Sequence, residues 1–138
     1  MAVSSVAFSW PVRIYWEDTD AGGVVYYANY LKFMERARSE WLRALGFEQD
    51  ALRDGHGVVF VVRRVEADYL SPARFNDQLD VSVSLHEAGR ASFNVKQTLT
   101  RGSTRLVSAQ VTLACVDAVR FKPVKIPAPI LQALDLAT

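Results

Sequence analysis

The sequence predicts one α+β domain over residues 1–138, in which a long helix packs against an antiparallel sheet of about five strands. Two patterns lead to this prediction. Residues 28–45 repeat apolar side chains at helical spacing, and residues 57–119 form several segments rich in strand-forming residues. A third observation is that no linker, internal repeat or low-complexity tract divides the chain, whose length is typical of a single domain.

The first strand is predicted over residues 8–18, FSWPVRIYWED. Asp18 and Asp20 then lie at its end, and Gly22–Gly23 allows the backbone to turn tightly. The helix is expected to begin between residues 27 and 29, so that a carboxylate faces a helix N-terminus.

The helix over residues 28–45 has one apolar side and one polar side, and Gly46 is a suitable stop. The apolar side consists of Tyr30, Leu31, Met34, Ala37, Trp41, Leu42 and Leu45. The polar side consists of Lys32, Glu35, Arg36, Ser39, Glu40 and Arg43. Glu35 and Glu40 are expected to form solvent-side ion pairs with Arg36, Arg38 or Arg43.

Four further strands are predicted over residues 57–70, 77–89, 91–103 and 104–119. EAGR and RGST are suitable turns between the last three. A proline-rich exit, KPVKIPAP, leaves residues 130–136 as a short terminal helix at most. Because one helix covers only one face of such a sheet, we expect the sheet or its edge to pair with a second copy in a symmetric oligomer.

Composition excludes several classes of function. With 16 basic and 15 acidic residues the net charge is +1, and the basic residues are scattered with no aromatics interleaved among them, so no nucleic-acid partner is expected. One cysteine, Cys115, excludes an intrachain disulfide, and two separated histidines predict no metal site. Without a signal peptide or a long apolar stretch, we expect a cytoplasmic protein with no integral membrane association.

The segment DTDAGGVVYYAN allows two interpretations from its residues alone. Free N–H groups at a helix start stabilise negative charge, and a carbonyl oxygen becomes negative when its carbon is attacked, so the segment suits acyl transfer. In the alternative, it is a structural Asp- and Gly-rich turn with Asn29 as the N-cap.

The run YWEDTDAGGVVYYANYLKFMERARSEWL resembles the signature of hotdog-fold acyl-CoA thioesterases, the group that contains 4-hydroxybenzoyl-CoA thioesterase and the YbgC thioesterases associated with Tol-Pal. The resemblance extends over essentially the whole chain, through VVRRVEADYLSPARFNDQLDV and GRASFNVKQ. Many YbgC-type members have histidine where this chain has Tyr27, and the hydroxybenzoyl type has tyrosine. The resemblance therefore leaves open which subgroup's mechanism applies.

The resemblance implies a role for each residue of the loop. Asp20 corresponds to the catalytic carboxylate, which either attacks the thioester carbonyl or activates a water. Tyr27 would present its backbone N–H to the carbonyl oxygen and its ring to the acyl pocket, the alternative being a plain core aromatic. Gly23 belongs with the residues that contact substrate, and Asp18 is the structural member of the pair.

The segment GRASF resembles the family's CoA-binding stretch, where Arg90 and Ser92 align with nucleotide and pantetheine contacts; the alternative for Arg90 is an exposed hairpin arginine. Lys96, Arg101 and Arg105 are weaker phosphate candidates. Some hotdog thioesterases use a glutamate within the central helix, and Glu35 or Glu40 would serve if this chain followed that plan. His86 in a strand and His56 in a loop are expected to be structural, His56 being the better functional candidate of the two. Cys115 is expected to be a small buried strand residue and no nucleophile.

The sequence therefore predicts an acyl-CoA thioester hydrolase with a hotdog fold, no cofactor, and a dimer or dimer of dimers. Two alternatives remain. A hotdog dehydratase or hydratase needs a histidine and an acid in the pocket, and DTDAGGVVYYANY has no histidine. A catalytically silent module that binds acyl-CoA or acyl-carrier protein is the other.

Overall fold

The computed structural model describes residues 8–136, apart from the side chain of Leu136. It contains five strands, three α-helices and a single 3-10 turn, η1 (Trp16–Asp18), within that range. The strands are β1 (Phe8–Arg13), β2 (Val58–Tyr69), β3 (Gln78–Ala88), β4 (Ser92–Arg101) and β5 (Thr104–Asp117), and the helices are α1 (Asn29–Ala44), α2 (Gln49–His56) and α3 (Ala128–Leu136).

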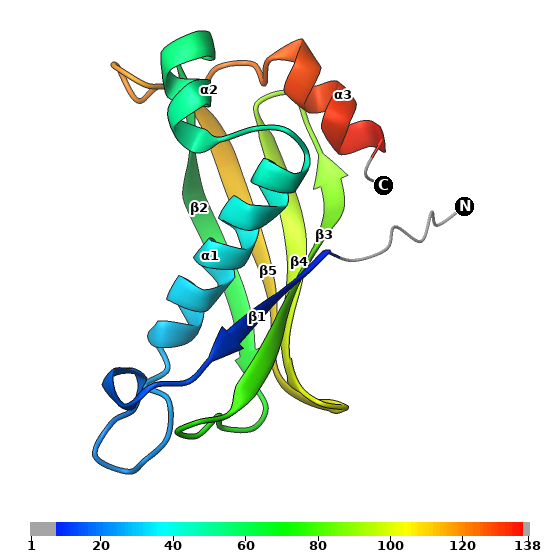
Figure 1. Cartoon of the computed structure of the whole chain (residues 1–138). Helices are drawn as coiled ribbons and strands as arrows, with labels where there is room; N and C mark the ends of the chain where they lie inside the picture. The colour runs from blue at the N-terminus through cyan, green and yellow to red at the C-terminus, as the bar shows by residue number, and fades with distance from the viewer. Residues whose placement is uncertain (1–7, 137–138) are drawn as a thin grey trace.

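The strands form one antiparallel sheet in the order β1-β3-β4-β5-β2 (Figure 1). This confirms the predicted sheet and both predicted hairpins. Gly102 in the β4–β5 turn has φ +60°, a left-handed conformation that glycine adopts without a Cβ clash. The edge strands are β1 and β2, which have a neighbouring strand on only one side.

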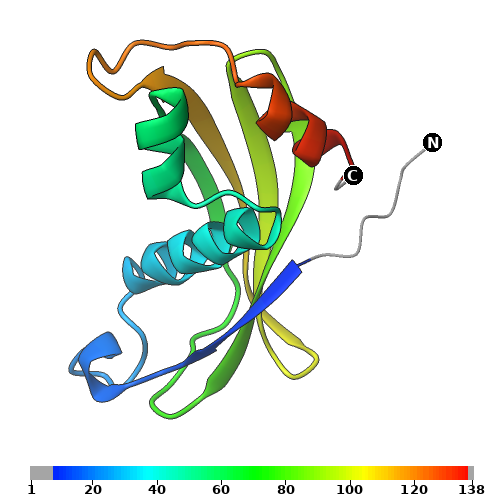
Figure 2. The ribbon, with the colours of Figure 1, turned by 45° about the horizontal axis from the view of Figure 1, so that its top comes forward.

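The helix α1 lies across one face of the sheet, and the sheet curves around it (Figure 2). The predicted apolar side is buried, except that Leu31 is 38% exposed and Leu45 is half-buried. Large apolar side chains from the sheet meet α1 in a single core, and each fully buried one contributes about 1.5–3 kcal/mol. The predicted stop is confirmed, because α1 ends at Ala44 and Gly46 has φ +99°.

The opposite face of the sheet is polar. Cross-strand pairs on this face include Ser82 with Thr98, whose hydroxyls are 2.7 Å apart, and Lys96 with Gln110. Such an alternation lets one face remain in water. The premise that both faces need a cover therefore fails for this polar face. Edge strand β2 carries three exposed apolar or aromatic residues, Val62, Val65 and Tyr69, while others lie on edge strand β1, as Trp10 does, and in the loops.

Three local predictions are corrected. The first strand ends at Arg13, and residues 16–18 form η1 because the Asp18 carboxylate accepts the Tyr15 N–H and closes a turn. His56 does not lie in a loop; it is the last residue of α2, which ends on Gly57 at φ +68°. The terminal helix is confirmed but begins two residues earlier, at Ala128.

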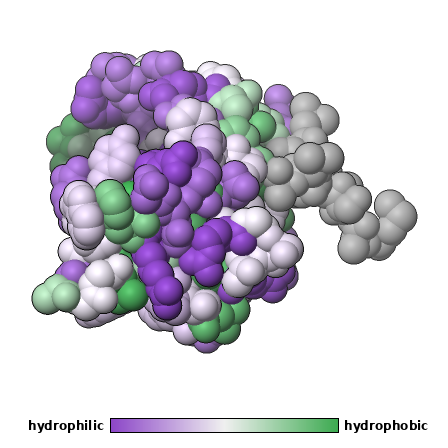
Figure 3. All heavy atoms as spheres, turned by 60° about the horizontal axis from the view of Figure 1, so that its bottom comes forward, coloured by the Kyte–Doolittle hydropathy of each residue, from purple (hydrophilic) through white to green (hydrophobic). Residues whose placement is uncertain are grey.

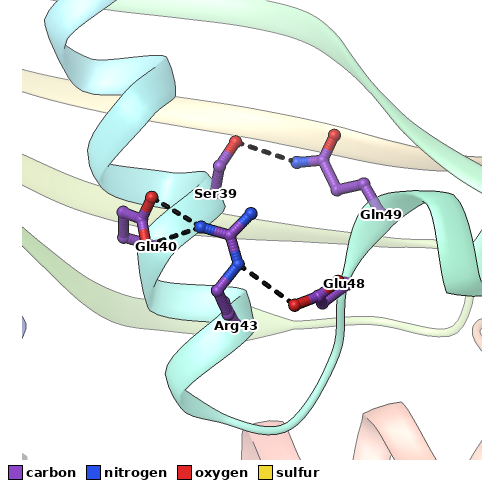
Figure 4. Close-up of polar contacts among 5 residues, drawn as sticks. All are labelled: Ser39, Glu40, Arg43, Glu48 and Gln49. Carbon is purple, nitrogen blue, oxygen red and sulfur yellow. Dashed lines mark hydrogen bonds and ion pairs between the residues drawn. The ribbon is translucent and has the colours of Figure 1, made fainter.

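Polar contacts fix the corner between α1 and α2 (Figure 4). The Arg43 guanidinium lies 2.7 Å from the Glu40 carboxylate and 3.4 Å from that of Glu48, and the Gln49 amide donates to the Ser39 hydroxyl at 3.1 Å. The predicted pairing of Glu40 is confirmed, but Glu35 forms no ion pair within residues 8–136. Arg38, which was expected on the solvent side, is buried.

Candidate active site

The loop from residue 18 to residue 27 leads from η1 into α1, and Asp18 holds both of its ends. The Asp18 carboxylate accepts the Tyr15 N–H at 2.8 Å. Its backbone carbonyl accepts the Tyr26 N–H at 3.1 Å and the Asn29 side-chain amide at 2.9 Å. The prediction that Asp18 holds the loop is confirmed. The alternative of Asn29 as N-cap is wrong, because Asn29 is already helical and its side chain reaches back to the loop.

Asp20 sits on a tight turn at the surface. Its N–H donates to the Val24 carbonyl at 2.9 Å, and its own carbonyl accepts the Gly23 N–H at 3.0 Å. One carboxylate oxygen, Oδ1, accepts the Gly22 N–H at 2.8 Å, while Oδ2 has no partner among residues 8–136. Gly23 has φ +80°, so the turn itself requires glycine at this position. The turn thus holds a carboxylate with one oxygen free.

The start of α1 leaves two backbone donors free. The Asn29 N–H donates to the Tyr26 carbonyl at 2.8 Å, and the Tyr30 N–H donates to the Tyr27 carbonyl at 3.3 Å. Within the described residues, the N–H groups of Tyr27 and Ala28 donate to no acceptor. They lie at the positive end of the helix dipole, where an oxyanion is stabilised.

An aromatic hollow of about 260 Å³ lies beside these donors. Tyr27 is 59% exposed and its ring stands edge-on to that of Tyr69 at 6.1 Å between centroids, so the core-aromatic alternative is wrong. The buried Tyr30 hydroxyl accepts the Ala73 N–H at 2.9 Å. Burial raises the pKa of both Tyr30 and Tyr69, so both hydroxyls are neutral at neutral pH. The hollow is lined by Val25, Tyr27, Tyr30, Tyr69, Leu70, Ser71 and Pro72.

The surface at the end of the molecule where α1 begins is largely hydrophilic, with small hydrophobic patches between (Figure 3). The segment that follows β2 is held there by Asp77, whose carboxylate accepts the Arg74 N–H at 2.9 Å and pairs with Arg101 at 2.7 Å. Burial alone would raise the pKa of Asp77, but these two contacts outweigh it and the pKa is lowered. Arg101, a weaker phosphate candidate, is therefore already paired.

Arg90 and Ser92 lie at the opposite end of the sheet from the Asp20 loop. Arg90 lies in the β3–β4 turn, where its side chain is exposed, and Ser92 is the first residue of β4. The Gly89 N–H donates to the Ser92 carbonyl at 2.7 Å and closes the turn. The Asp20 loop is joined through Val25 and Ala73 to the segment that Arg101 holds. Arg101 is the last residue of β4 and Ser92 is the first, so the length of this strand, roughly 30 Å, separates the Ser92 end of the sheet from the end that carries the Asp20 loop. One chain does not bring the predicted site residues together.

The other candidates are dispersed. Lys96 and Arg105 line a hollow of about 610 Å³ on the polar sheet face, together with Glu66 and Asp68. His86 is exposed on β3. Within residues 8–136, no group of three or more His, Cys, Asp or Glu side chains is placed to hold a metal ion. No helix in the same range is long and apolar enough to cross a membrane.

Cys115 is buried on β5, as predicted. Burial raises the pKa of its thiol to about 11, so at neutral pH it is protonated and a poor nucleophile.

The model of the thioesterase-like superfamily matches residues 14–134. The chain belongs to this superfamily. It is 45% identical over 126 residues to the acyl-CoA thioesterase YbgC of Haemophilus influenzae, covering 91% of this chain and 93% of that protein. It is 41% identical over 130 residues to the acyl-CoA thioester hydrolase YbgC of Escherichia coli, covering 94% and 96%.

The fold agrees with that of solved structures at 29% and 36% identity. A probable thioesterase from Bartonella henselae has a TM-score of 0.85 and 36% identity, covering 88% of this chain and 100% of that chain. A protein from Aquifex aeolicus has a TM-score of 0.86 and 29% identity, covering 92% and 98%. The predicted hotdog α+β class is confirmed.

Proposed function

We propose that this member of the thioesterase-like superfamily hydrolyses acyl-CoA thioesters to a free carboxylic acid and CoA. The observation that carries the proposal is the pair of acceptor-free N–H groups at Tyr27 and Ala28, on the same loop as the half-free carboxylate of Asp20. The aromatic hollow beside them suits an acyl group. The relatives named YbgC thioesterases support the same chemistry.

In the proposed reaction the thioester carbonyl oxygen accepts hydrogen bonds from the start of α1. The Asp20 carboxylate either attacks the carbonyl carbon, forming an anhydride that water then cleaves, or removes a proton from an attacking water. In both routes the C–S bond breaks and CoA leaves as a thiolate. Because a thiol ionises near ~8.5 in the cysteine reference, this departure needs no strong general acid.

We further propose that the working site is shared between two copies. The start of β2 lies at the same end of the sheet as Arg90. Both segments are next to the end of β5, because Val58 of β2 pairs with Asp117 and Phe93 of β4 pairs with Leu113. Pairing β2 with the β2 of a second copy in antiparallel fashion would bring the Arg90 end of one copy beside the Asp20 end of the other. Edge strand β2 has unpaired backbone groups and exposed valines for such a contact.

In this arrangement Arg90 and Ser92 of one copy bind the nucleotide and pantetheine of a substrate whose carbonyl meets Asp20 of the other. Gly23 allows the substrate to approach the turn without a side chain in the way. A cytoplasmic location, predicted from the sequence, stays a prediction.

The test is a hydrolysis screen over acyl-CoA esters of varied chain length and aromaticity, with the released thiol detected by a chromogenic disulfide. The buried, high-pKa Cys115 keeps the protein's own background low. We expect turnover of at least one ester class. Binding without turnover across the whole screen would support the silent binding module instead.

A further inference from the structure

The loop between β5 and α3 holds two apolar side chains out in water. Val119 is 87% exposed, the highest value among the large apolar side chains of residues 8–136, and Phe121 is 64% exposed. Figures 1 and 2 show this loop, coloured orange, projecting beyond the β2 edge of the sheet. The two side chains are therefore presented on the side of the molecule where the sheet is open to a further strand.

Hydrogen bonds within the loop fix its shape. The Asp117 carboxylate accepts the N–H groups of Val119 at 2.9 Å and Arg120 at 2.8 Å. The Phe121 N–H donates to the Asp117 carbonyl at 2.8 Å. Phe121 has φ +55°, a left-handed conformation that is unfavourable for a residue with a Cβ. The loop thus maintains a strained backbone that carries an uncovered ring outward, and such strain favours a role for the ring.

The aromatic hollow beside the start of α1, which we call the Tyr27 hollow, lacks a cover in one chain. Three of its lining residues, Tyr27, Tyr69 and Leu70, are exposed. A site for a small apolar group normally buries most of the surface of that group. The hollow of a single chain therefore needs a further apolar wall before it can enclose an acyl group.

Edge strand β2 separates the loop from the Tyr27 hollow. The Ala118 N–H donates to the Gly57 carbonyl at 2.9 Å, so the loop lies beside Val58, the first residue of β2. The hollow lies at the other end of the strand, where Tyr69 is the last residue. Antiparallel pairing of β2 with the β2 of a second copy sets the first residue of each strand beside the last residue of the other. The loop of each copy then meets the hollow of the other copy.

The charges beside the two surfaces are complementary. Arg120 lies next to Phe121 in the loop, and Asp68 precedes Tyr69 at the end of β2. Both charged side chains are exposed, and neither has an ion pair within residues 8–136. The same pairing of β2 strands brings these opposite charges together, so it joins apolar surface to apolar surface and a cation to an anion.

We propose that the β5–α3 loop of one copy closes the Tyr27 hollow of the other, and that Phe121 is the wall against which the acyl group packs. This inference rests on the proposed hydrolase function and on the shared site. Phe121 is then a specificity-determining residue, because an acyl group large enough to reach its ring gains a contact that a smaller one lacks.

The contact is tested by disulfide trapping with Phe121→Cys and Leu70→Cys in the same chain. Within one chain these positions lie at opposite ends of β2, roughly 40 Å apart, whereas a disulfide needs Cα atoms within about 7 Å. Only a disulfide between two copies can therefore form. Mild oxidation should convert most of the double variant to a covalent dimer on a non-reducing gel, and a reductant should reverse this.

Phe121→Cys combined with Trp10→Cys is the matched control, because Trp10 is an exposed side chain on the other edge strand, β1. This variant and each single variant should run largely as monomers, and wild type gives the background because Cys115 is buried. Little covalent dimer from the Leu70 pair, or as much from the Trp10 pair, would overturn the proposal. No thioester enters this experiment, so a protein that hydrolyses acyl-CoA but does not trap refutes this inference and leaves the hydrolase function standing.

The role of the ring is tested with Phe121→Asn, because asparagine tolerates the left-handed conformation and so preserves the shape of the loop. The value of kcat/KM should fall about tenfold or more for the largest acyl group that the enzyme turns over, and should stay within twofold for the smallest. Trp10→Asn, which removes an exposed ring from the β1 edge, should leave both values unchanged. Equal losses for the two esters, or no loss for either, would overturn the role of Phe121.

Discussion

Exchanging Asp20 for asparagine separates the chemistry of the loop from its structure. One oxygen of the Asp20 carboxylate accepts a hydrogen bond from the Gly22 N–H, and the other hydrogen bonds of Asp20 are made by its backbone. Asparagine keeps an oxygen for Gly22 and keeps the same backbone, so the turn should persist and the free energy of unfolding should change little. What disappears is the negative charge and, with it, the oxygen that acts as nucleophile or base in the proposed reaction.

We therefore expect Asp20→Asn to lower kcat by about 100-fold or more, which corresponds to about 2.7 kcal/mol of transition-state stabilisation. The assay is initial-rate hydrolysis of the best ester from the screen, with urea unfolding as the stability measurement. Asp18→Asn is the matched control. Since Asp18 holds Tyr15 and the loop, this change should affect stability more and kcat less.

The assignment within the pair would be refuted if Asp18→Asn reduced kcat more than Asp20→Asn in folded proteins. An Asp20→Asn enzyme within threefold of wild type would refute the catalytic role itself.

Three other predictions concern the helix start, the CoA contact and the buried tyrosine. Tyr27→Pro removes an N–H that has no internal acceptor, so a folded variant should lose roughly 100- to 1000-fold in kcat while Tyr27→Phe stays near wild type; the reverse result would make the hydroxyl the working group. Arg90→Gln should raise KM for CoA esters but not for pantetheine thioesters. Mixing Arg90→Gln subunits with Asp20→Asn subunits should give more activity than either variant alone, because one site of each mixed dimer then has both residues. No recovery would place the site in one chain. Tyr30→Phe leaves the buried Ala73 N–H without its acceptor and should lower the free energy of unfolding, measured in urea, by about 1–3 kcal/mol. An unchanged unfolding midpoint would show that this hydrogen bond contributes nothing to stability.

The fold was predictable where periodic burial governs local structure. The long helix and the four strands after it each carry an apolar pattern that meets the core, and their positions agree with the prediction to within a few residues. The helix α2 was missed because Leu52 is its one buried residue, so it has no apolar stripe to detect. The predicted first strand was too long because a side chain, Asp18, accepts a backbone N–H and turns the chain, which strand propensity does not register.

The candidate site was predictable where adjacent residues in the chain build it. The loop motif located the carboxylate turn and the helix start together, since only a few residues separate Asp20 from Tyr27. Tyr69 was missed because it reaches the Tyr27 ring from the end of β2, through pairing with β5. The burial of Arg38 was missed because a charge on a helix is expected at the surface, and its contact with Gln97 is made 59 residues away in the chain.

The two aspartates of the loop are the same residue type two positions apart, and their hydrogen-bond partners distinguish them. Asp18 receives hydrogen bonds at its carboxylate and at its carbonyl, and the latter fix Tyr26 and Asn29 at the start of α1. Asp18 thereby orients the backbone N–H groups of Tyr27 and Ala28, which have no acceptor among residues 8–136. Asp20 lies on the turn that follows, with one oxygen held and one free. The proposed reaction asks the loop for both a fixed oxyanion site and an available carboxylate, and two acids can supply them: Asp18, whose acceptors hold the helix start in place, and Asp20, which keeps one carboxylate oxygen free.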